Sequence, residues 1–170
     1  SDTSTHFDRL RALGRASDWH EIERVFRWVA ARLAGEARAQ EVESIELGAY
    51  ERELADGIAR AYRQARTHNA SAIYFEYDLD NDWASNFFIC GQYRPEDAKD
   101  EDWACDWLSE LKGPSFGRFS ELYHENRGFD NSPFAAGSTL YLVARTVAAF
   151  GRASEVAGVP PCVLCMGFHD

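Results

Sequence analysis

The chain has 170 residues, of which 45% are hydrophobic and 14% aromatic, a composition typical of a globular protein and not of a disordered one. Its formal net charge of −10 argues against nucleic acid and against an anionic membrane surface as partners. No stretch approaches the roughly 18 apolar residues of a membrane span, and the polar start does not resemble a signal peptide. We therefore expect a single globular domain, residues 1–170, in the cytoplasm.

The first part of the chain predicts two amphipathic helices. Residues 17–34 place apolar side chains at helical spacing, begin at a capping Ser-Asp pair and end before Gly35. Residues 49–67 form the second helix, with apolar positions on one side and four arginines on the other. The boundary between the two helices stays open, because the alternation over residues 42–47 also fits a short strand.

A β-hairpin is predicted over about residues 72–90. Residues 73–79 are β-branched and aromatic, Asp80-Asn81 offers turn chemistry, and residues 83–90 are again aromatic and apolar. The aspartates around the turn give this hairpin an acidic tip.

Two short helices are predicted after a polar loop at residues 91–102. The first covers residues 103–111, with Asp102 as its cap, and ends at a Gly-Pro pair. The second covers residues 116–124 and leads into a loop at residues 126–137.

The last part predicts a buried helix and a final strand. Residues 138–150 are apolar on nearly all sides, which is typical of a helix in the interior. Arg145 is the one charge in that helix, and we expect it to form an ion pair with an acid of the sheet, with anion binding as the alternative. Residues 162–168 follow two prolines and read as a strand. The fold class is therefore α+β, with several helices on a small, mainly antiparallel sheet.

The acidic charge is concentrated in residues 76–110. This stretch holds eleven carboxylates against only Arg94 and Lys99, and it also contains Trp83, Trp103 and Trp107, each directly after an aspartate. A local negative field with large aromatic side chains in it favours a surface that meets a positively charged partner. A solvated acidic face on a structural or regulatory module is the alternative.

The spacing of Asp78, Asp80 and Asp82 matches the first half of an EF-hand loop, but Trp83 occupies the position that needs glycine. A calcium site is therefore disfavoured. An alternative function is a metal-assisted hydrolase that uses these three aspartates together with His124 or His169. The sequence contains no nucleophile elbow, phosphate loop or dinucleotide motif, which lowers the odds of an enzyme.

The four cysteines are most simply small apolar side chains in a reduced cytosol. Cys162 and Cys165 have the two-residue spacing of a zinc site, but they lie in a strand-like run, where residues three apart point to opposite faces. The other two, Cys90 and Cys105, do not form a second close pair. No metal or other cofactor is expected.

Residues 102–107 place two tryptophans, and also two aspartates, one helical turn apart. Trp103 and Trp107 fit a buried stripe, whereas the aspartates repel each other and would be relieved by a cationic partner. The acidic hairpin tip at residues 78–83 and the acidic, Trp-bearing loop and helix at residues 97–107 resemble in general character the small acidic immunity proteins of bacterial toxin systems. That resemblance implies a non-catalytic inhibitor of a basic toxin or nuclease. The candidate partner-binding residues are Asp78, Asp80, Asp82, Trp83, Asp97, Asp100, Glu101, Asp102 and Asp106.

Overall fold

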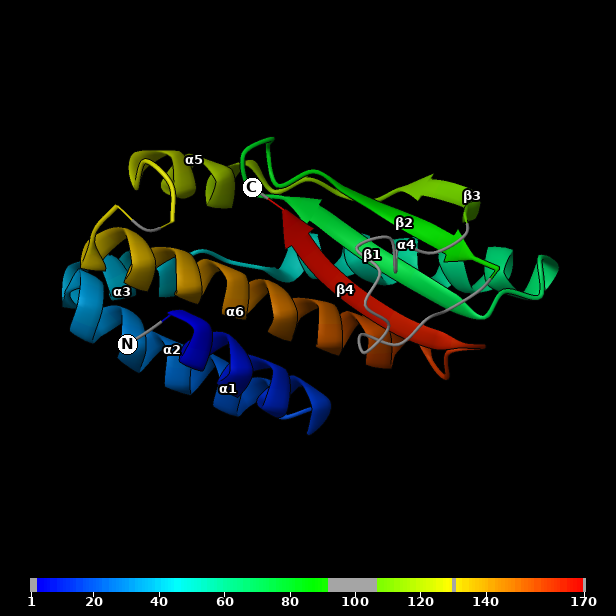
Figure 1. Ribbon diagram of the computed structural model, residues 1–170, viewed down its shortest axis with the longest axis horizontal. Coiled ribbons are helices and arrows are strands. Elements are labelled where there is room, and N and C mark those ends of the chain that lie inside the picture. The colour runs from blue at the N-terminus through cyan, green and yellow to red at the C-terminus, as the bar shows by residue number, and fades with distance from the viewer. Residues whose placement is uncertain (1–2, 92–106, 130, 170) are drawn as a thin grey trace.

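Helices and strands follow one another in a mixed order along the chain (Figure 1). The computed structural model describes residues 3–91, 107–129 and 131–169. The helices in this part are α1 (Thr3–Arg15), α2 (Trp19–Ala34), α3 (Glu36–Glu43), α4 (Gly48–Thr67), α5 (Gly117–Glu125) and α6 (Pro133–Ala157). The strands are β1 (Ala72–Asp78), β2 (Ser85–Cys90), β3 (Trp107–Lys112) and β4 (Val163–His169).

The sheet has the order β3-β2-β1-β4. The predicted hairpin is confirmed, because β1 and β2 pair antiparallel, and β2 also pairs antiparallel with β3. The predicted C-terminal strand is confirmed as well, but β4 runs parallel to β1. A parallel neighbour requires a long crossover connection, and the chain between β3 and β4 supplies one through α5 and α6. The α+β class with a mostly antiparallel sheet is thus correct.

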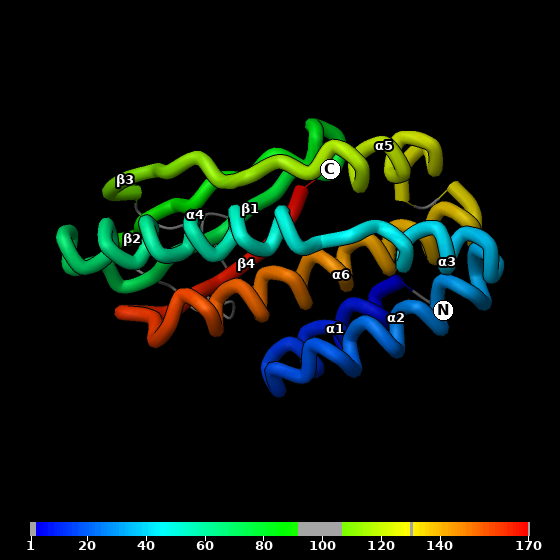
Figure 2. The backbone as a smooth tube through the Cα atoms, turned by 180° about the vertical axis from the view of Figure 1, so that it is seen from behind, coloured from blue at the N-terminus to red at the C-terminus, as the bar shows by residue number. Residues whose placement is uncertain are grey.

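The long helix α6 lies at the centre of the helical layer, packed against α2 and α4 (Figures 1 and 2). It is longer than predicted, because Ser132 caps it by accepting a hydrogen bond from the Ala135 N–H and Pro133 occupies the first turn. By length and composition α6 could cross a membrane, but 78% of its apolar window is buried inside the protein. It is a core helix, as its composition predicted.

The helices α2 and α4 lie where the sequence placed them. Asp18 caps α2 by accepting a hydrogen bond from the Glu21 N–H at 3.2 Å, and Gly35 follows its end at φ 97°. Two helices were not predicted, α1 and α3. The alternative of a strand over residues 42–47 is wrong, since α3 extends to Glu43 and its few apolar positions pack against α2 and α6.

The expected ion pair of Arg145 is present, but its acid lies on a helix and not on the sheet. The guanidinium donates to Glu23 of α2 at 3.1 Å. It also donates to the carbonyl oxygens of Val42 and Ile45 at 2.7 and 2.8 Å. These carbonyls belong to the end of α3 and the segment that follows it, so Arg145 joins α6 to two neighbouring helices and satisfies backbone groups left open there.

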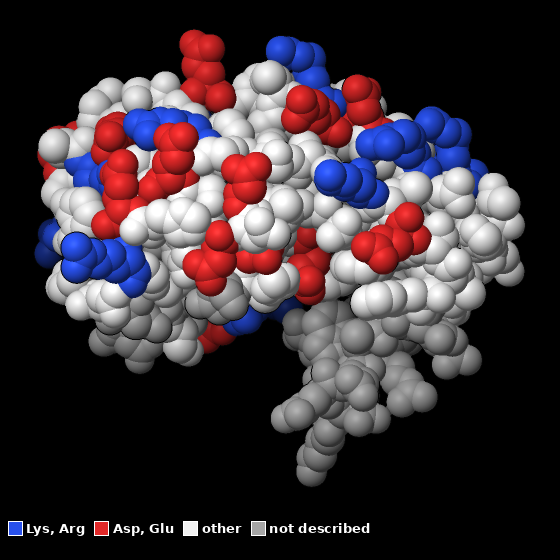
Figure 3. Space-filling model, turned by 90° about the horizontal axis from the view of Figure 1, so that it is seen from above, with Lys and Arg blue, Asp and Glu red and all other residues white. Residues whose placement is uncertain are grey.

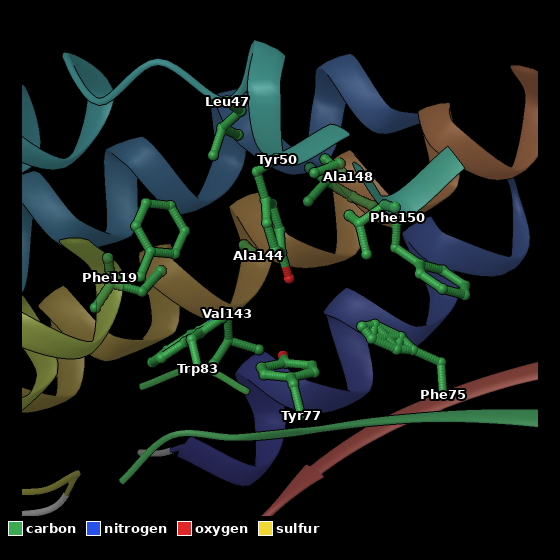
Figure 4. Packing of buried hydrophobic residues seen from close by; sticks show 14 of the residues in the cluster. Leu47, Tyr50, Phe75, Tyr77, Trp83, Phe119, Val143, Ala144, Ala148 and Phe150 are labelled. Atoms are coloured by element: carbon green, nitrogen blue, oxygen red, sulfur yellow. The ribbon is translucent and has the colours of Figure 1, made fainter. Parts of the chain in front are cut away.

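The core between the sheet and the helices is rich in aromatic rings (Figure 4). Phe75 of β1 packs on Phe87 at 5.0 Å and on Phe150 of α6 at 4.7 Å between ring centroids. The hydroxyl groups of Tyr50 and Tyr77 point toward each other in Figure 4, and neither has a hydrogen-bond partner within the described residues. Burial raises the pKa of both phenols above the ordinary value of 10.0.

These two phenols predict a loss of stability in alkali. The folded protein holds their protons more tightly than the unfolded chain does, so stability is intact below pH 10 and falls as the pH rises above it. Urea denaturation at pH 8 and pH 11 should show this loss. Tyr77→Phe should reduce it and should raise the free energy of unfolding at pH 8 by about 1 kcal/mol, since it removes an unsatisfied buried hydroxyl. Titration of all tyrosines near pH 10 in a folded protein would contradict the prediction.

Candidate functional site: the acidic end of the hairpin

The turn between β1 and β2 places three exposed residues, 80–82, between two buried ones. Leu79 and Trp83 are fully buried, whereas Asp80 and Asp82 are exposed. Asp78 ends β1, so the three aspartates whose spacing was compared with an EF-hand loop do not lie along one strand. The Asp80 N–H instead donates to Asp78 Oδ1 at 3.0 Å, which is the hydrogen bond of an Asx-turn.

Trp83 belongs to the core and not to the binding surface that was predicted for it. Its Nε1–H donates to Thr146 Oγ1 of α6 at 3.1 Å, and its ring packs between Tyr77 and Phe119, with centroid distances of 5.5 and 5.7 Å (Figure 4). The apolar part of the indole is thus packed in the core, and its N–H has a hydrogen-bond acceptor. Its burial leaves the neighbouring aspartates as the exposed part of the turn.

The helix α5 holds this turn from one side. The Phe116 N–H, at the start of α5, donates to the Asp82 carbonyl at 3.0 Å, and His124 Nε2 lies 3.0 Å from the Asp80 carbonyl. A β-carbon placed on Gly117 would lie 3.1 Å from Asp82 Oδ1, so this carboxylate sits at the first residue of α5. The positive end of the helix dipole stabilises a negative charge there. Among the described residues, His124 contacts a backbone carbonyl of the turn and not a carboxylate.

The face of the sheet opposite the helices continues this acidic region. Alternate side chains of a strand face opposite sides of the sheet. The even-numbered residues Tyr74, Glu76 and Asp78 of β1 therefore point to the face away from the helices. The Tyr74 hydroxyl donates to Glu76 Oε2 at 3.1 Å. His169 of β4 places Nε2 3.5 Å from Glu76 Oε1 and 3.7 Å from Asp78 Oδ2. The parallel register of β4 beside β1 therefore brings one histidine to two carboxylates.

We call Glu76, Asp78, Asp80 and Asp82 the hairpin acidic surface. Within the described residues, no arginine or lysine forms a salt bridge with any of these four carboxylates. Most carboxylates on the helices do have an arginine partner. The paired ones are Asp8, Glu21, Glu23, Glu36, Glu41, Glu43, Glu51, Glu121 and Glu125.

Uncompensated charge of this kind projects a field into solvent. Figure 3 views the molecule from the side of the hairpin turn. Acidic and basic side chains are intermixed at both ends of this face, and the acidic ones in its middle have fewer basic neighbours. The hairpin acidic surface therefore favours a cationic partner.

Five of the predicted site residues lie outside the residues that the structure describes: Asp97, Asp100, Glu101, Asp102 and Asp106. The sequence predicted a helix over residues 103–111. For the part of it that the structure describes, from Trp107 onward, this prediction is wrong, because Trp107–Lys112 forms β3 and pairs with the edge of β2. Pairing with an available strand edge has overridden the local helical spacing of the apolar residues.

The strand β3 also presents an aromatic side chain that the sequence placed in the interior. Trp107 is 58% exposed and stacks on Phe88 at a centroid distance of 4.5 Å, on the same face of the sheet as Tyr74. Glu110 pairs across from Phe88 and adds a carboxylate to that face. The alternation of side chains between the two faces of β1 and β2 is the sequence signal that could have placed Tyr74 and Glu76 on this face.

The cysteines differ from one another. Cys90 is disulfide-bonded, whereas Cys162 and Cys165 are not part of a disulfide. The expectation of reduced, apolar cysteines is therefore wrong for Cys90, and a four-cysteine zinc site is ruled out because a disulfide sulfur cannot act as a thiolate ligand. A disulfide is more typical of an oxidising compartment than of the cytoplasm. Among the described residues, no group of three or more His, Cys, Asp or Glu side chains is arranged to hold a metal ion.

Comparisons with protein-family models, with curated proteins and with solved structures found no match to this chain.

Proposed function

We propose that this protein is a non-catalytic binding protein that neutralises a basic protein partner, in the manner of an immunity protein that inhibits a bacterial toxin. The supporting observation is the contrast between the hairpin acidic surface, which has no arginine or lysine partner in the described part of the chain, and the helices, where most carboxylates are paired. A basic partner would supply the missing counter-charges. Complementary fields of this kind accelerate association and select against acidic competitors.

The turn is also held in place before any partner arrives. Its backbone is bonded to α5 through the Asp80 and Asp82 carbonyls, and Trp83 anchors it in the core. A surface that is already ordered loses little conformational entropy on binding, which favours affinity.

Aromatic side chains on the sheet face add a second component to the proposed interface. The exposed Trp107 and the half-buried Tyr74 take the role of aromatic anchors that the sequence gave to Trp83, since tryptophan and tyrosine contribute most to protein interfaces when they become buried. The partner would therefore contact both the hairpin acidic surface and the sheet face beside it.

No observation favours the alternative of a metal-assisted hydrolase. Asp78 and Asp80 are joined by the hydrogen bond of the turn, and Asp82 lies against α5. Metal-assisted hydrolysis requires carboxylates that converge on one ion. The described residues offer no such convergence.

The proposal predicts slower association when the turn is neutralised. The partner would be captured from the source organism on the immobilised chain, and its association rate measured by stopped-flow fluorescence. The variant Asp78→Asn/Asp80→Asn/Asp82→Asn keeps the side-chain shapes and the Asx-turn acceptor. We expect its association to be about tenfold slower at low salt, with the difference shrinking as salt screens the charges.

The matched control is Glu36→Gln/Glu43→Gln/Glu121→Gln, which changes the net charge equally at carboxylates that already have arginine partners. It should slow association much less. An equal effect of the two variants would mean that net charge, and not the hairpin acidic surface, attracts the partner. A change below about threefold in both would refute electrostatic steering altogether.

A further inference from the structure

A cavity of about 680 Å³ lies beside β4, between α1 and α6. It is lined mainly by apolar side chains, among them Phe7 and Leu10 of α1, Val147 and Phe150 of α6, and Leu164 and Met166 of β4. Its volume is in the range of ordinary ligand sites. Tyr74 and Tyr77 of β1 also line it, and among the described residues Tyr74 is the one that the cavity shares with the interface proposed above.

The strand β4 borders this cavity with one of its edges. Among the strands that the structure describes, β4 is the outermost on its side of the sheet, so no described strand pairs with this edge. The Val163 N–H donates to the Ser71 carbonyl, and the His169 carbonyl accepts from the Leu79 N–H, so the odd-numbered residues of β4 bond to β1. Because the direction of the backbone groups alternates along a strand, the N–H and C=O groups of Leu164, Met166 and Phe168 point away from β1.

These open backbone groups face the cavity. All five residues from Leu164 to Phe168 line it. The side chains of successive residues in this run point to opposite faces of the sheet. All five residues can therefore line the cavity only if the edge of the strand borders it. In both views of the backbone, α1 lies beyond β4, on the side of the sheet away from β3 (Figures 1 and 2).

The charge of the cavity is opposite to that of the hairpin. Arg11 and Arg15 belong to its lining, and no aspartate or glutamate does among the described residues. Arg11 pairs with Asp8 at the exposed surface, at 3.1 Å, and Arg15 makes no salt bridge with any residue that the structure describes. In a chain with a net charge of −10, this groove is suited to a segment that carries carboxylates.

We propose that an extended segment of a partner protein adds to the edge of β4 as a fifth strand. Its backbone pairs with Leu164, Met166 and Phe168, its alternate apolar side chains enter the cavity, and an acidic end residue meets Arg11 or Arg15. Strand addition uses main-chain hydrogen bonds for affinity and pockets at alternate positions for specificity, and the open edge and the cavity supply both.

The probe is the blocked, fluorescein-labelled peptide Glu-Val-Thr-Val-Thr-Val-Glu, with binding followed by fluorescence anisotropy. Two derivatives carry N-methyl groups, one on all the valines and one on both threonines. We expect saturable binding of the parent peptide. One derivative should bind at least tenfold more weakly and the other about as well as the parent, because only one edge of an added strand bonds to β4. A peptide with lysine in place of glutamate should bind severalfold more weakly.

The protein offers a matched pair of variants at Gly14 of α1. A β-carbon there has only Val147 Cγ1 near it, at 4.0 Å, so Gly14→Ala fits and Gly14→Trp places an indole in the cavity. We expect Gly14→Ala to retain peptide binding and Gly14→Trp to abolish it.

Three outcomes would overturn the proposal. They are no binding of any peptide at millimolar concentration, equal binding of both N-methylated derivatives, and binding that Gly14→Trp leaves unchanged. Sedimentation velocity tests a different occupant: a dimer that Gly14→Trp dissociates would show that a second copy of this chain, and not a partner segment, covers the edge.

Discussion

Trp83→Ala is expected to lower the free energy of unfolding by about 3–5 kcal/mol. The side chain is fully buried, and its removal leaves a large cavity among Tyr77, Phe119 and Tyr123, whose rings all pack against it. The Nε1–H hydrogen bond to Thr146 is lost at the same time. Chemical denaturation followed by far-ultraviolet circular dichroism measures the effect.

Two further variants separate packing from surface roles. Thr146→Val keeps the shape of the partner and removes its oxygen, so it should cost about 1–3 kcal/mol by leaving the indole N–H unpaired. Trp107→Ala removes a half-exposed ring and should cost much less stability than Trp83→Ala. A Trp83→Ala protein as stable as the wild type would place this indole outside the core and would restore it as a candidate for the binding surface.

Arg38→Ala is expected to lower the free energy of unfolding by about 3 kcal/mol. Arg38 of α3 is only 6% exposed, yet it is charged. It donates to the Leu122 carbonyl at 3.0 Å, to Asn126 Oδ1 at 2.9 Å and to Ser138 Oγ at 2.9 Å. Its removal leaves these acceptors, which belong to α5, its C-cap and α6, without their donor.

The same guanidinium also pairs with Glu41 and Glu125, at 2.6 and 3.1 Å. Arg38→Lys should recover only part of the loss, because an ammonium group cannot reach acceptors on two sides as the planar guanidinium does. Arg27→Ala is the matched control: Arg27 also pairs with two glutamates, but these lie at the surface, where solvent screens the pairs. If the two alanine variants lose equal stability in urea denaturation, Arg38 does not hold α5 and α6 together.

Both residues show where sequence patterns mislead. Trp83 follows an aspartate in an acidic segment and was assigned to the surface, although it directly follows an exposed turn, residues 80–82, and packs into the core at the end of that turn. Arg38 gave no signal at all, because an arginine in a short polar helix normally faces solvent. Its burial depends on α5 and α6, whose buried polar acceptors lie 84 to 100 residues further along the chain.

Only part of the hairpin acidic surface could be predicted from the sequence. Asp78, Asp80 and Asp82 were identified from composition and turn chemistry, and two of the three are exposed. Glu76 and His169 were not assigned to a common site, because the parallel register that places them together joins strands at the two ends of a long crossover. The predicted helix that includes Trp107 failed for a related reason, since the free edge of β2 decides the conformation of β3.

The sequence by itself determined the α+β class, the helices α2 and α4, the hairpin and the apolar character of α6. These features depend on periodicity, caps and turn residues, which act between neighbours in the chain. Only the tertiary structure decided that β4 runs parallel to β1, that Trp83 is buried, that Arg38 joins three helices and that β4 is the outermost of the described strands beside a cavity. Such features depend on contacts between residues far apart in the chain, where burial and strand pairing outweigh local preference.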